Sequence, residues 1–131
     1  DPKTKAIQRA DLPCSGPQGM ALAEGAVWVA CTLDSVVLAV DAATLTVRHT
    51  VPVEGSPDTV VVAQGRPVVI AEDGPTVVIL DPTTGAVVQR LPLSDAAPLG
   101  DRANLDAVVV GDRVWVSSYR EGMVYAVPLP F

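Results

Sequence analysis

The chain has 131 residues, of which 49% are hydrophobic and 4% aromatic, and its formal net charge at pH 7 is −6. This length predicts one domain, and an acidic chain without a stripe of Lys and Arg argues against nucleic acid and anionic membranes as partners. No apolar run is long enough to cross a membrane. The charged first residues do not resemble a signal peptide, and a start without Met predicts an excised, soluble domain.

A repeated unit organises the chain, and its valine-rich segments, separated by Gly and Pro, predict sheet. Gly followed by an apolar strand occurs at residues 25–29, 65–70 and 111–116. An aspartate follows the first two copies, at Asp41 and Asp81. The repeat length of about 40 residues is typical of one blade of a β-propeller.

Each unit is predicted to contain four strands, named A to D in chain order. In the first unit we expect strands at residues 19–23, 27–30, 36–40 and 46–51. In the second unit we expect them at 59–63, 68–71, 76–80 and 86–91. The third unit has only A, B and C, at 107–110, 114–117 and 123–127. Several strands are apolar on both faces, as in sheets that pack between neighbours.

The N-terminal segment carries the outer strand that the third unit lacks. Ala6–Arg9 resembles Ala86–Arg90, and both segments lead to a Leu-Pro pair. The sequence therefore predicts an all-β fold of three four-stranded antiparallel propeller blades, in which residues 6–12 form the outer strand of the last blade. The predicted blades span approximately residues 14–53, 54–93 and 94–131.

Three blades are fewer than the about four to eight found in propellers. We therefore expect a homodimer in which two chains form one six-bladed ring, and each N-terminal strand completes the last blade of the partner. The alternative is that the chain is a fragment of a longer propeller.

Three motifs of the chain resemble those of a known class of propeller repeats. Gly-x-Val-Trp-Val at 25–29, Val-x-x-Val-Asp-x-x-Thr at 37–44 and Gly-Ser-Pro at 55–57 are similar to YVTN and virginiamycin-B-lyase-like, or NHL-like, repeats. The resemblance implies a propeller related to lyases, surface proteins and the extracellular sensor modules of bacterial Ser/Thr kinases. It also implies that a lyase needs a catalytic His near the central channel, whereas His49, the single His, is expected on an outer strand.

No P-loop, dinucleotide-binding glycine motif, Gly-x-Ser-x-Gly or His-Glu-x-x-His occurs in the sequence. We therefore expect a non-enzymatic ligand-binding or sensor module of a larger receptor or extracytoplasmic protein, in the periplasm, at the cell surface or outside the cell. The alternatives are a fragment of a metal-dependent propeller lyase or hydrolase, and a structural propeller for protein–protein interaction. No cofactor or metal is expected, although carboxylates in loops can bind Ca²⁺.

Strand direction predicts where a ligand would bind. The D–A and B–C connections share one end of an antiparallel blade, hereafter the loop end, and most acidic residues of the chain fall in these connections. Binding residues gather on loops held by a rigid scaffold, but loops are also acidic simply because they are polar. The candidate ligand-binding residues are Asp34, Asp58, Asp73, Asn104, Asp106, Tyr119 and Arg120. The longest connection, Ser94–Asn104, is expected to help form this site.

Two further residue pairs carry predictions. Cys14 and Cys31 both fall at the loop end, so they are a candidate disulfide, which would indicate an oxidising compartment. Two buried thiols fit the sequence equally well. Trp28 and Trp115 occupy equivalent positions on strand B, and we expect them to pack between blades rather than to stack on a ligand.

Overall fold

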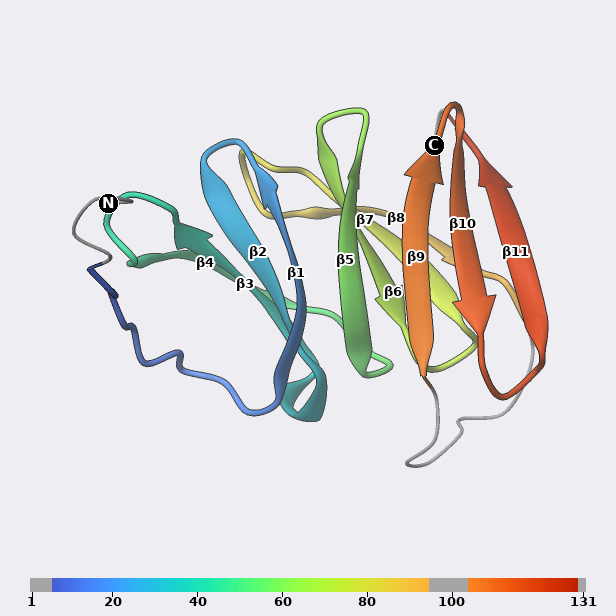
Figure 1. The fold of residues 1–131 in the computed structure, drawn as a ribbon, viewed down its shortest axis with the longest axis horizontal. Helices are drawn as coiled ribbons and strands as arrows, with labels where there is room; N and C mark the ends of the chain where they lie inside the picture. Colours follow the sequence, from blue (N-terminus) through green and yellow to red (C-terminus); the bar gives the residue numbers. More distant parts are fainter. Residues whose placement is uncertain (1–5, 95–103, 130–131) are drawn as a thin grey trace.

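The structure is a computed structural model that describes residues 6–94 and 104–129. Within these ranges the chain forms three antiparallel sheets, called blades 1 to 3, which lie side by side in a row (Figure 1). Blade 1 comprises β1 (Pro17–Ala23), β2 (Ala26–Cys31), β3 (Val36–Asp41) and β4 (Val47–Pro52). Blade 2 comprises β5 (Pro57–Ala63), β6 (Arg66–Ala71), β7 (Thr76–Leu80) and β8 (Val87–Pro92). Blade 3 comprises β9 (Leu105–Val110), β10 (Arg113–Ser118) and β11 (Met123–Pro128).

The predicted all-β propeller fold is confirmed. Every predicted strand of the three units is present, and each observed strand begins and ends within two residues of its prediction. The remaining element is the short 3-10 turn η1 (Thr32–Asp34), which links β2 to β3. The first strands of the blades, β1, β5 and β9, contact one another along the row.

The A–B hairpin turns show which residues of the three blades are equivalent. Glu24 and Gly25 both have positive φ, as do Gln64 and Gly65, which is the geometry of a tight hairpin turn. In blade 3 the glycine comes first, because the turn is Gly111-Asp112. The strand pairing consequently places Trp28, Val68 and Trp115 at equivalent positions.

The C–D turns of blades 1 and 2 are held by aspartate side chains. The Asp41 carboxylate accepts the backbone N–H groups of Ala43 and Thr44 at 2.9 and 3.0 Å. The Asp81 carboxylate accepts those of Thr83 and Thr84 at 2.8 and 3.0 Å. Each aspartate thus satisfies backbone donors that the turn leaves without a strand partner.

The apolar core lies between the blades. One cluster joins blade 1 to blade 2 and contains Trp28, Val60 and Val78, and a second joins blade 2 to blade 3 and contains Ile79 and Val116. Because blade 2 is covered on both faces, every residue of β7 is buried. In β10 of blade 3, by contrast, buried and exposed residues alternate.

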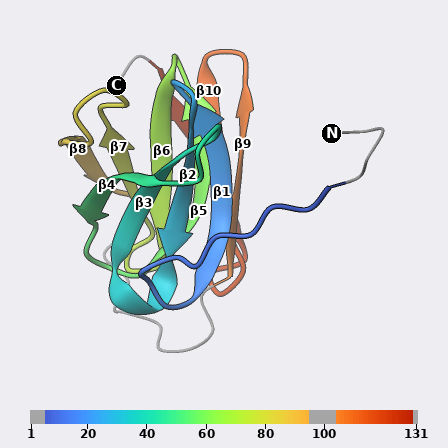
Figure 2. The same cartoon turned by 90° about the vertical axis from the view of Figure 1, so that its left-hand side faces the viewer.

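The N-terminal segment forms no strand in the single chain, since residues 6–16 have no ladder partner. Figure 2 looks onto the outward face of blade 1 and shows this segment crossing in front of it. Leu12 and Cys14 pack there against Val29, Leu38 and Val40. The segment and β11 lie at opposite ends of the row (Figure 1), so residues 6–12 do not complete blade 3 of their own chain.

Candidate functional site

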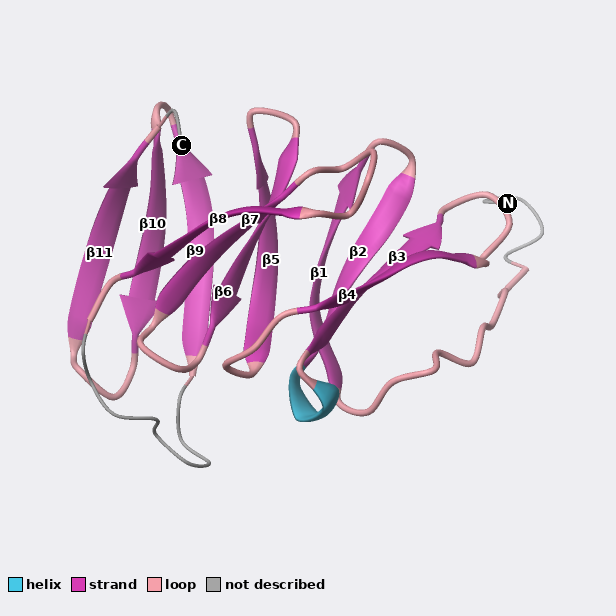
Figure 3. Ribbon diagram, turned by 180° about the vertical axis from the view of Figure 1, so that it is seen from behind, coloured by secondary structure: helices cyan, strands magenta, loops and turns pink. Residues whose placement is uncertain are grey.

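The connections β2–β3, β4–β5, β6–β7, β8–β9 and β10–β11 meet at one end of the blades, which is the loop end expected from strand direction. Figure 3 shows η1, drawn in cyan, at this end. All seven candidate ligand-binding residues lie in or beside these connections. Most of the predicted Ser94–Asn104 connection, residues 95–103, lies outside the described residues.

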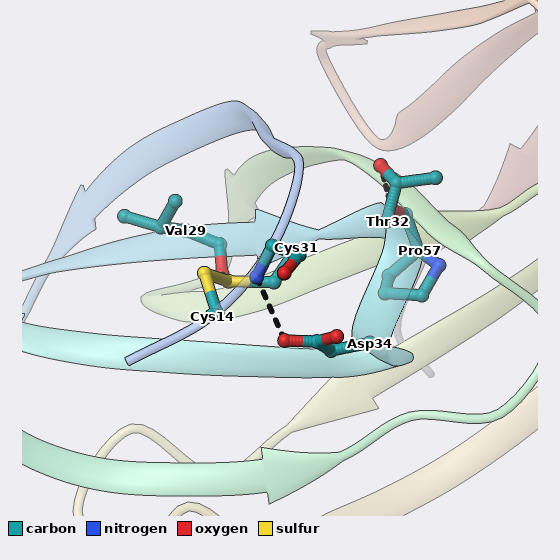
Figure 4. Close-up of a disulfide and its surroundings, with 7 residues drawn as sticks. Cys14, Val29, Cys31, Thr32, Asp34 and Pro57 are labelled. Atoms are coloured by element: carbon teal, nitrogen blue, oxygen red, sulfur yellow. Dashed lines mark hydrogen bonds between the residues drawn. A yellow bond between two sulfur atoms is a disulfide. The ribbon is translucent and has the colours of Figure 1, made fainter. Parts of the chain in front are cut away.

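Asp34 belongs to the framework of blade 1. Its carboxylate accepts the backbone N–H of Ser15 at 2.7 Å (Figure 4). Next to it, Cys14 and Cys31 form a disulfide with their Cα atoms 5.9 Å apart. The hydroxyl of Thr32 donates to the Pro57 carbonyl at 2.7 Å and so connects blade 1 to blade 2. Asp34 therefore has a structural role, because it ties the segment before β1 to η1.

Asp58 and Glu72 form the centre of the loop end. Asp58 is only 9% exposed, and burial raises the pKa of its carboxyl, although it accepts the N–H of Leu105 and bonds to Glu72. Burial also raises the pKa of Glu72, and the negative charges of Asp58 and Asp73 raise it further, to about 7. With a pKa of about 7, Glu72 is therefore protonated in a substantial fraction of the molecules at neutral pH.

The sequence builds this pair in two steps. A β-bulge between Pro57 and Thr59 redirects the Asp58 side chain, since a bulge breaks the alternation of faces along a strand. Glu72 follows the buried end of β6 directly, and its N–H donates to the Ser56 carbonyl at 2.9 Å. The Leu105 contact then links the pair to the first strand of blade 3.

Asp73 and Asp106 flank the pair. The negative charge of Asp73 acts on Glu72, and that of Asp106 acts on Asp58. The Asp106 carboxylate also accepts the N–H of Ala107 at 2.8 Å. The structure therefore brings together three of the predicted residues, namely Asp58, Asp73 and Asp106, around a Glu72 that was not among the candidates.

The remaining candidates lie on blade 3. Tyr119 is 75% exposed, and its backbone N–H donates to the Asn104 carbonyl at 3.1 Å. Arg120 is exposed in the same turn. The following residue, Glu121, accepts a hydrogen bond from the Tyr125 hydroxyl at 3.0 Å. The constellation predicted for these residues also includes positions 95–103, which are outside the described residues.

Charges are distributed unequally between the two ends. Both ion pairs found among the described residues, Arg48–Asp41 and Arg113–Asp112, lie at the end opposite the loop end. Arg90 also reaches the loop end, where its guanidinium donates to the Glu54 carbonyl at 3.3 Å. This contact was not expected from the sequence.

The described residues contain neither a candidate metal-binding cluster nor a helix that could cross a membrane. No three His, Cys, Asp or Glu side chains in residues 6–94 and 104–129 are placed to hold a metal ion. The same ranges contain no helix that is long and apolar enough to cross a membrane. His49 lies in β4, stacks on Trp28 with ring centroids 6.0 Å apart, and adjoins Gly85 at the end opposite the loop end.

Comparison with known proteins places the chain in a family. The profile of the family described as "Outer membrane protein assembly factor BamB" matches residues 7–129. No curated protein matches the sequence. Two solved structures share the fold at 15% identity: a Bacteroides caccae protein of unknown function (TM-score 0.61) and Kuenenia stuttgartiensis hydrazine synthase (TM-score 0.59).

These alignments cover 77% and 91% of this chain but only 38% and 37% of the two structures, so the chain spans well under half of either. At such low identity the likeness shows the fold alone. The family profile, by contrast, covers nearly the whole chain. The chain belongs to the outer membrane protein assembly factor BamB family, and its three sheets are blades of a β-propeller.

Proposed function

We propose that this chain is a non-enzymatic binding module of a larger extracytoplasmic protein, and that it binds a basic segment of a partner protein at its loop end. The observation that carries the proposal is the Asp58–Glu72 pair, two hydrogen-bonded carboxyls between blades 2 and 3. Two flanking carboxylates, Asp73 and Asp106, add negative charge to the same place.

The chemistry of the pair favours a cationic ligand. A carboxyl pair that holds a proton at neutral pH releases it when a positive charge approaches, because the cation favours the ionised form. A Lys or Arg side chain of a partner supplies such a charge together with hydrogen-bond donors. Neither ion pair found among the described residues involves Asp58, Glu72, Asp73 or Asp106.

Two observations support a protein partner outside the cytoplasm. The family takes its name from the assembly of outer membrane proteins, which is an interaction role. The Cys14–Cys31 disulfide is typical of oxidising compartments. A sensor module of a receptor, as the repeat resemblance suggests, would use the same end. The metal-dependent lyase alternative has less support, because His49 lies at the opposite end.

Binding of trilysine, measured by titration calorimetry at low ionic strength, tests the proposal. Affinity should rise between pH 6 and pH 8, because the Glu72 pKa is about 7 and the ionised carboxylate binds a cation more strongly. Glu72→Gln should remove this pH dependence and weaken binding at pH 8 by roughly fivefold, the loss of about 1 kcal/mol of ion-pair energy.

Glu24→Gln is the matched control, since Glu24 is an exposed carboxylate in the turn at the opposite end. It should leave trilysine affinity and its pH dependence unchanged. Equal losses in Glu72→Gln and Glu24→Gln would mean that trilysine senses only net charge, and the proposal would be wrong.

The melting temperature of Glu72→Gln, measured as a function of pH, tests the assigned Glu72 pKa independently of ligand binding. Because the folded-state pKa of Glu72 lies above its ordinary 4.5, the contribution to stability is complete below pH 4.5 and is lost as pH rises through about 7. Glu72→Gln should therefore have a higher melting temperature than the wild type at pH 8, and this difference in melting temperature should become smaller towards pH 5. A difference that does not change with pH would contradict the assigned pKa.

A further inference from the structure

The bulge that carries Asp58 is held by blade 1 as well as by its own blade. Pro57, Asp58 and Thr59 open β5, and the register of β5 with β6 shifts between Pro57 and Thr59. The extra residue of a bulge has no partner across the ladder, so strand pairing alone leaves its orientation open. Contacts from outside the sheet therefore decide where the Asp58 side chain lies.

The first of these contacts is a side-chain hydrogen bond. Thr32 is 9% exposed, and its hydroxyl donates to the Pro57 carbonyl at 2.7 Å (Figure 4). That carbonyl belongs to the peptide unit that ends at the nitrogen of Asp58, and a peptide unit is planar. The bond from Thr32 therefore fixes the plane from which the Asp58 backbone continues.

The second contact is a close approach of two backbone segments. Gly19 of β1 lies against the same bulge, and a methyl group added to it would stand 2.5 Å from the Thr59 Cα and 2.7 Å from the Asp58 carbonyl oxygen. Only a residue without a side chain fits so close to another backbone. Thr32 thus contacts the peptide unit before Asp58, and Gly19 contacts the peptide unit after it.

Thr32 is itself held by the segment before β1. Its N–H donates to the Gly16 carbonyl at 3.0 Å. The residue before it, Cys31, is bonded to Cys14 of the same segment (Figure 4). The disulfide and this hydrogen bond therefore hold the start of η1 where the Thr32 hydroxyl reaches blade 2.

The equivalent position of the repeat joins blade 2 to blade 3. Thr32 follows β2 directly, and Glu72 follows β6 directly. Glu72 bonds to Asp58, and Asp58 accepts the N–H of Leu105, the first residue of β9. Each of the two residues thus connects the end of one strand B to the start of strand A in the next blade. Three blades consequently meet at Asp58.

We propose that Thr32 and Gly19 of blade 1 are positioning residues for the Asp58–Glu72 pair between blades 2 and 3. The pair belongs to the binding site proposed above, so the effect of these residues on a ligand rests on that proposed function. Their effect on the titration of the pair needs no ligand and does not depend on it.

Loss of either contact from blade 1 should let water reach the pair. Burial is the largest cause that raises the pKa of Glu72 to about 7, and the charges of Asp58 and Asp73 raise it further. Asp106 faces Asp58 and carries the same sign of charge. A looser bulge hydrates the carboxyls and separates them, which favours the ionised form. The Glu72 pKa should then fall towards its ordinary 4.5.

The test is an NMR titration of the Glu72 side-chain carboxyl in the whole chain without ligand. Thr32→Val keeps the shape of the side chain but removes the hydroxyl, and it should lower the titration midpoint by roughly one pH unit, the usual size of an environmental shift for Glu. Thr32→Ser retains the hydroxyl and should titrate like the wild type. Gly19→Ala displaces the bulge and should also lower the midpoint.

Trp28→Phe is the matched control. It removes a buried hydrogen bond of the same kind, from the Trp28 indole N–H to the Ala23 carbonyl at 3.2 Å, at the opposite end of the same interface between blades 1 and 2. It should lower the stability and leave the Glu72 midpoint unchanged. An unchanged midpoint in Thr32→Val, or in Gly19→Ala if Thr32→Val does not fold, would overturn the proposal, as would an equal shift in Trp28→Phe.

Trilysine binding separates this inference from the proposed function. If the wild type binds trilysine as expected and Thr32→Val binds it with the same affinity and pH dependence, the binding function stands and the positioning role is wrong. If Thr32→Val shifts the Glu72 midpoint but the wild type does not bind trilysine, the positioning role stands and the proposed function is wrong.

Discussion

The two outer blades are built from one repeat but differ in what surrounds them. Trp28 on blade 1 is fully buried, whereas the equivalent Trp115 on blade 3 is 39% exposed. On its other side, Leu12 and Cys14 cover part of blade 1, and a disulfide holds that cover in place, while Met20 and Leu22 stay exposed. The open face of blade 3 has no cover among the described residues.

This difference shows that burial at a position of the repeat depends on the neighbouring blade. The strand B residues of blade 2, in β6, are buried after the first one, because blades lie on both sides. In β10 of blade 3 only alternate residues are buried, since only one neighbour is present. The same sequence pattern therefore gives a core in one blade and a surface in another.

Substitution of the two tryptophans should give the largest effect. Trp28→Ala should lower the free energy of unfolding by about 3–5 kcal/mol, the cost of removing a large buried side chain. Trp115→Ala should cost less, about 2–3 kcal/mol in a single chain, because 39% of its surface already contacts water. Urea unfolding of both variants measures the difference.

Protein concentration makes this comparison sharper. If copies of the chain associate through the open face of blade 3, Trp115→Ala should lower the free energy of unfolding by more at concentrations where they associate than at high dilution. Unfolding curves at two protein concentrations separate these cases. Equal losses for Trp28→Ala and Trp115→Ala at high dilution would contradict the burial difference between blades 1 and 3.

Removal of the disulfide tests the cover on blade 1. The bond closes a loop between residues 17 positions apart, and Cys14→Ser should cost about 3 kcal/mol. Leu12 should then separate from Val29 and Leu38, so that the outward face of blade 1 becomes as open as that of blade 3. Thermal unfolding gives the stability, and a dye that binds exposed apolar surface reports the opening.

Cys14→Ala is the control, since it removes the same bond without adding a hydroxyl. Both variants should behave alike, and reductant should affect the wild type but neither variant. A melting temperature unchanged by Cys14→Ser would show that apolar packing alone holds the segment.

Sequence reasoning predicted the fold well, because local rules determine it. The turn at Asp81, the Gly-Val-rich strands and the interval of the repeat all act within one blade, so they are visible along the chain. The burial of Trp28 also followed from the pattern. The exposure of Trp115 did not, since it depends on a neighbour that the described residues do not contain.

The candidate site was only partly predictable. Strand direction placed the acids at one end, but it could not show that Asp34 is used by Ser15 or that Glu72 meets Asp58. Those contacts depend on a bulge in β5 and on the packing of one blade against the next. A carboxylate directly after the buried strand β6 was the one available signal for Glu72.

The smallest expected effect compares the C–D turns, which blades 1 and 2 have and the described part of blade 3 lacks. Hydrogen bonds from Thr44, the Arg48 guanidinium and Ala43 hold the pKa of Asp41 well below its usual range. The Asp81 pKa is lowered as well, through the N–H groups of Thr84 and Thr83. Asp41→Asn should therefore destabilise the chain more than Asp81→Asn, because only Asp41 also loses the pairing with Arg48.

The pH dependence of that difference has a definite sign. A carboxyl with a lowered folded-state pKa stabilises the fold above its ordinary pKa of 3.8, and this contribution is lost as pH falls through the folded-state value. The difference in free energy of unfolding between the wild type and Asp41→Asn should thus be constant near pH 6 and should become smaller in strong acid. Amide exchange in β3 and β4, compared with β10 and β11, should show that blade 1 loses protection first in acid. If blade 3 loses protection first, the lack of a fourth strand among its described residues, rather than the charged turns, determines which end of the row opens.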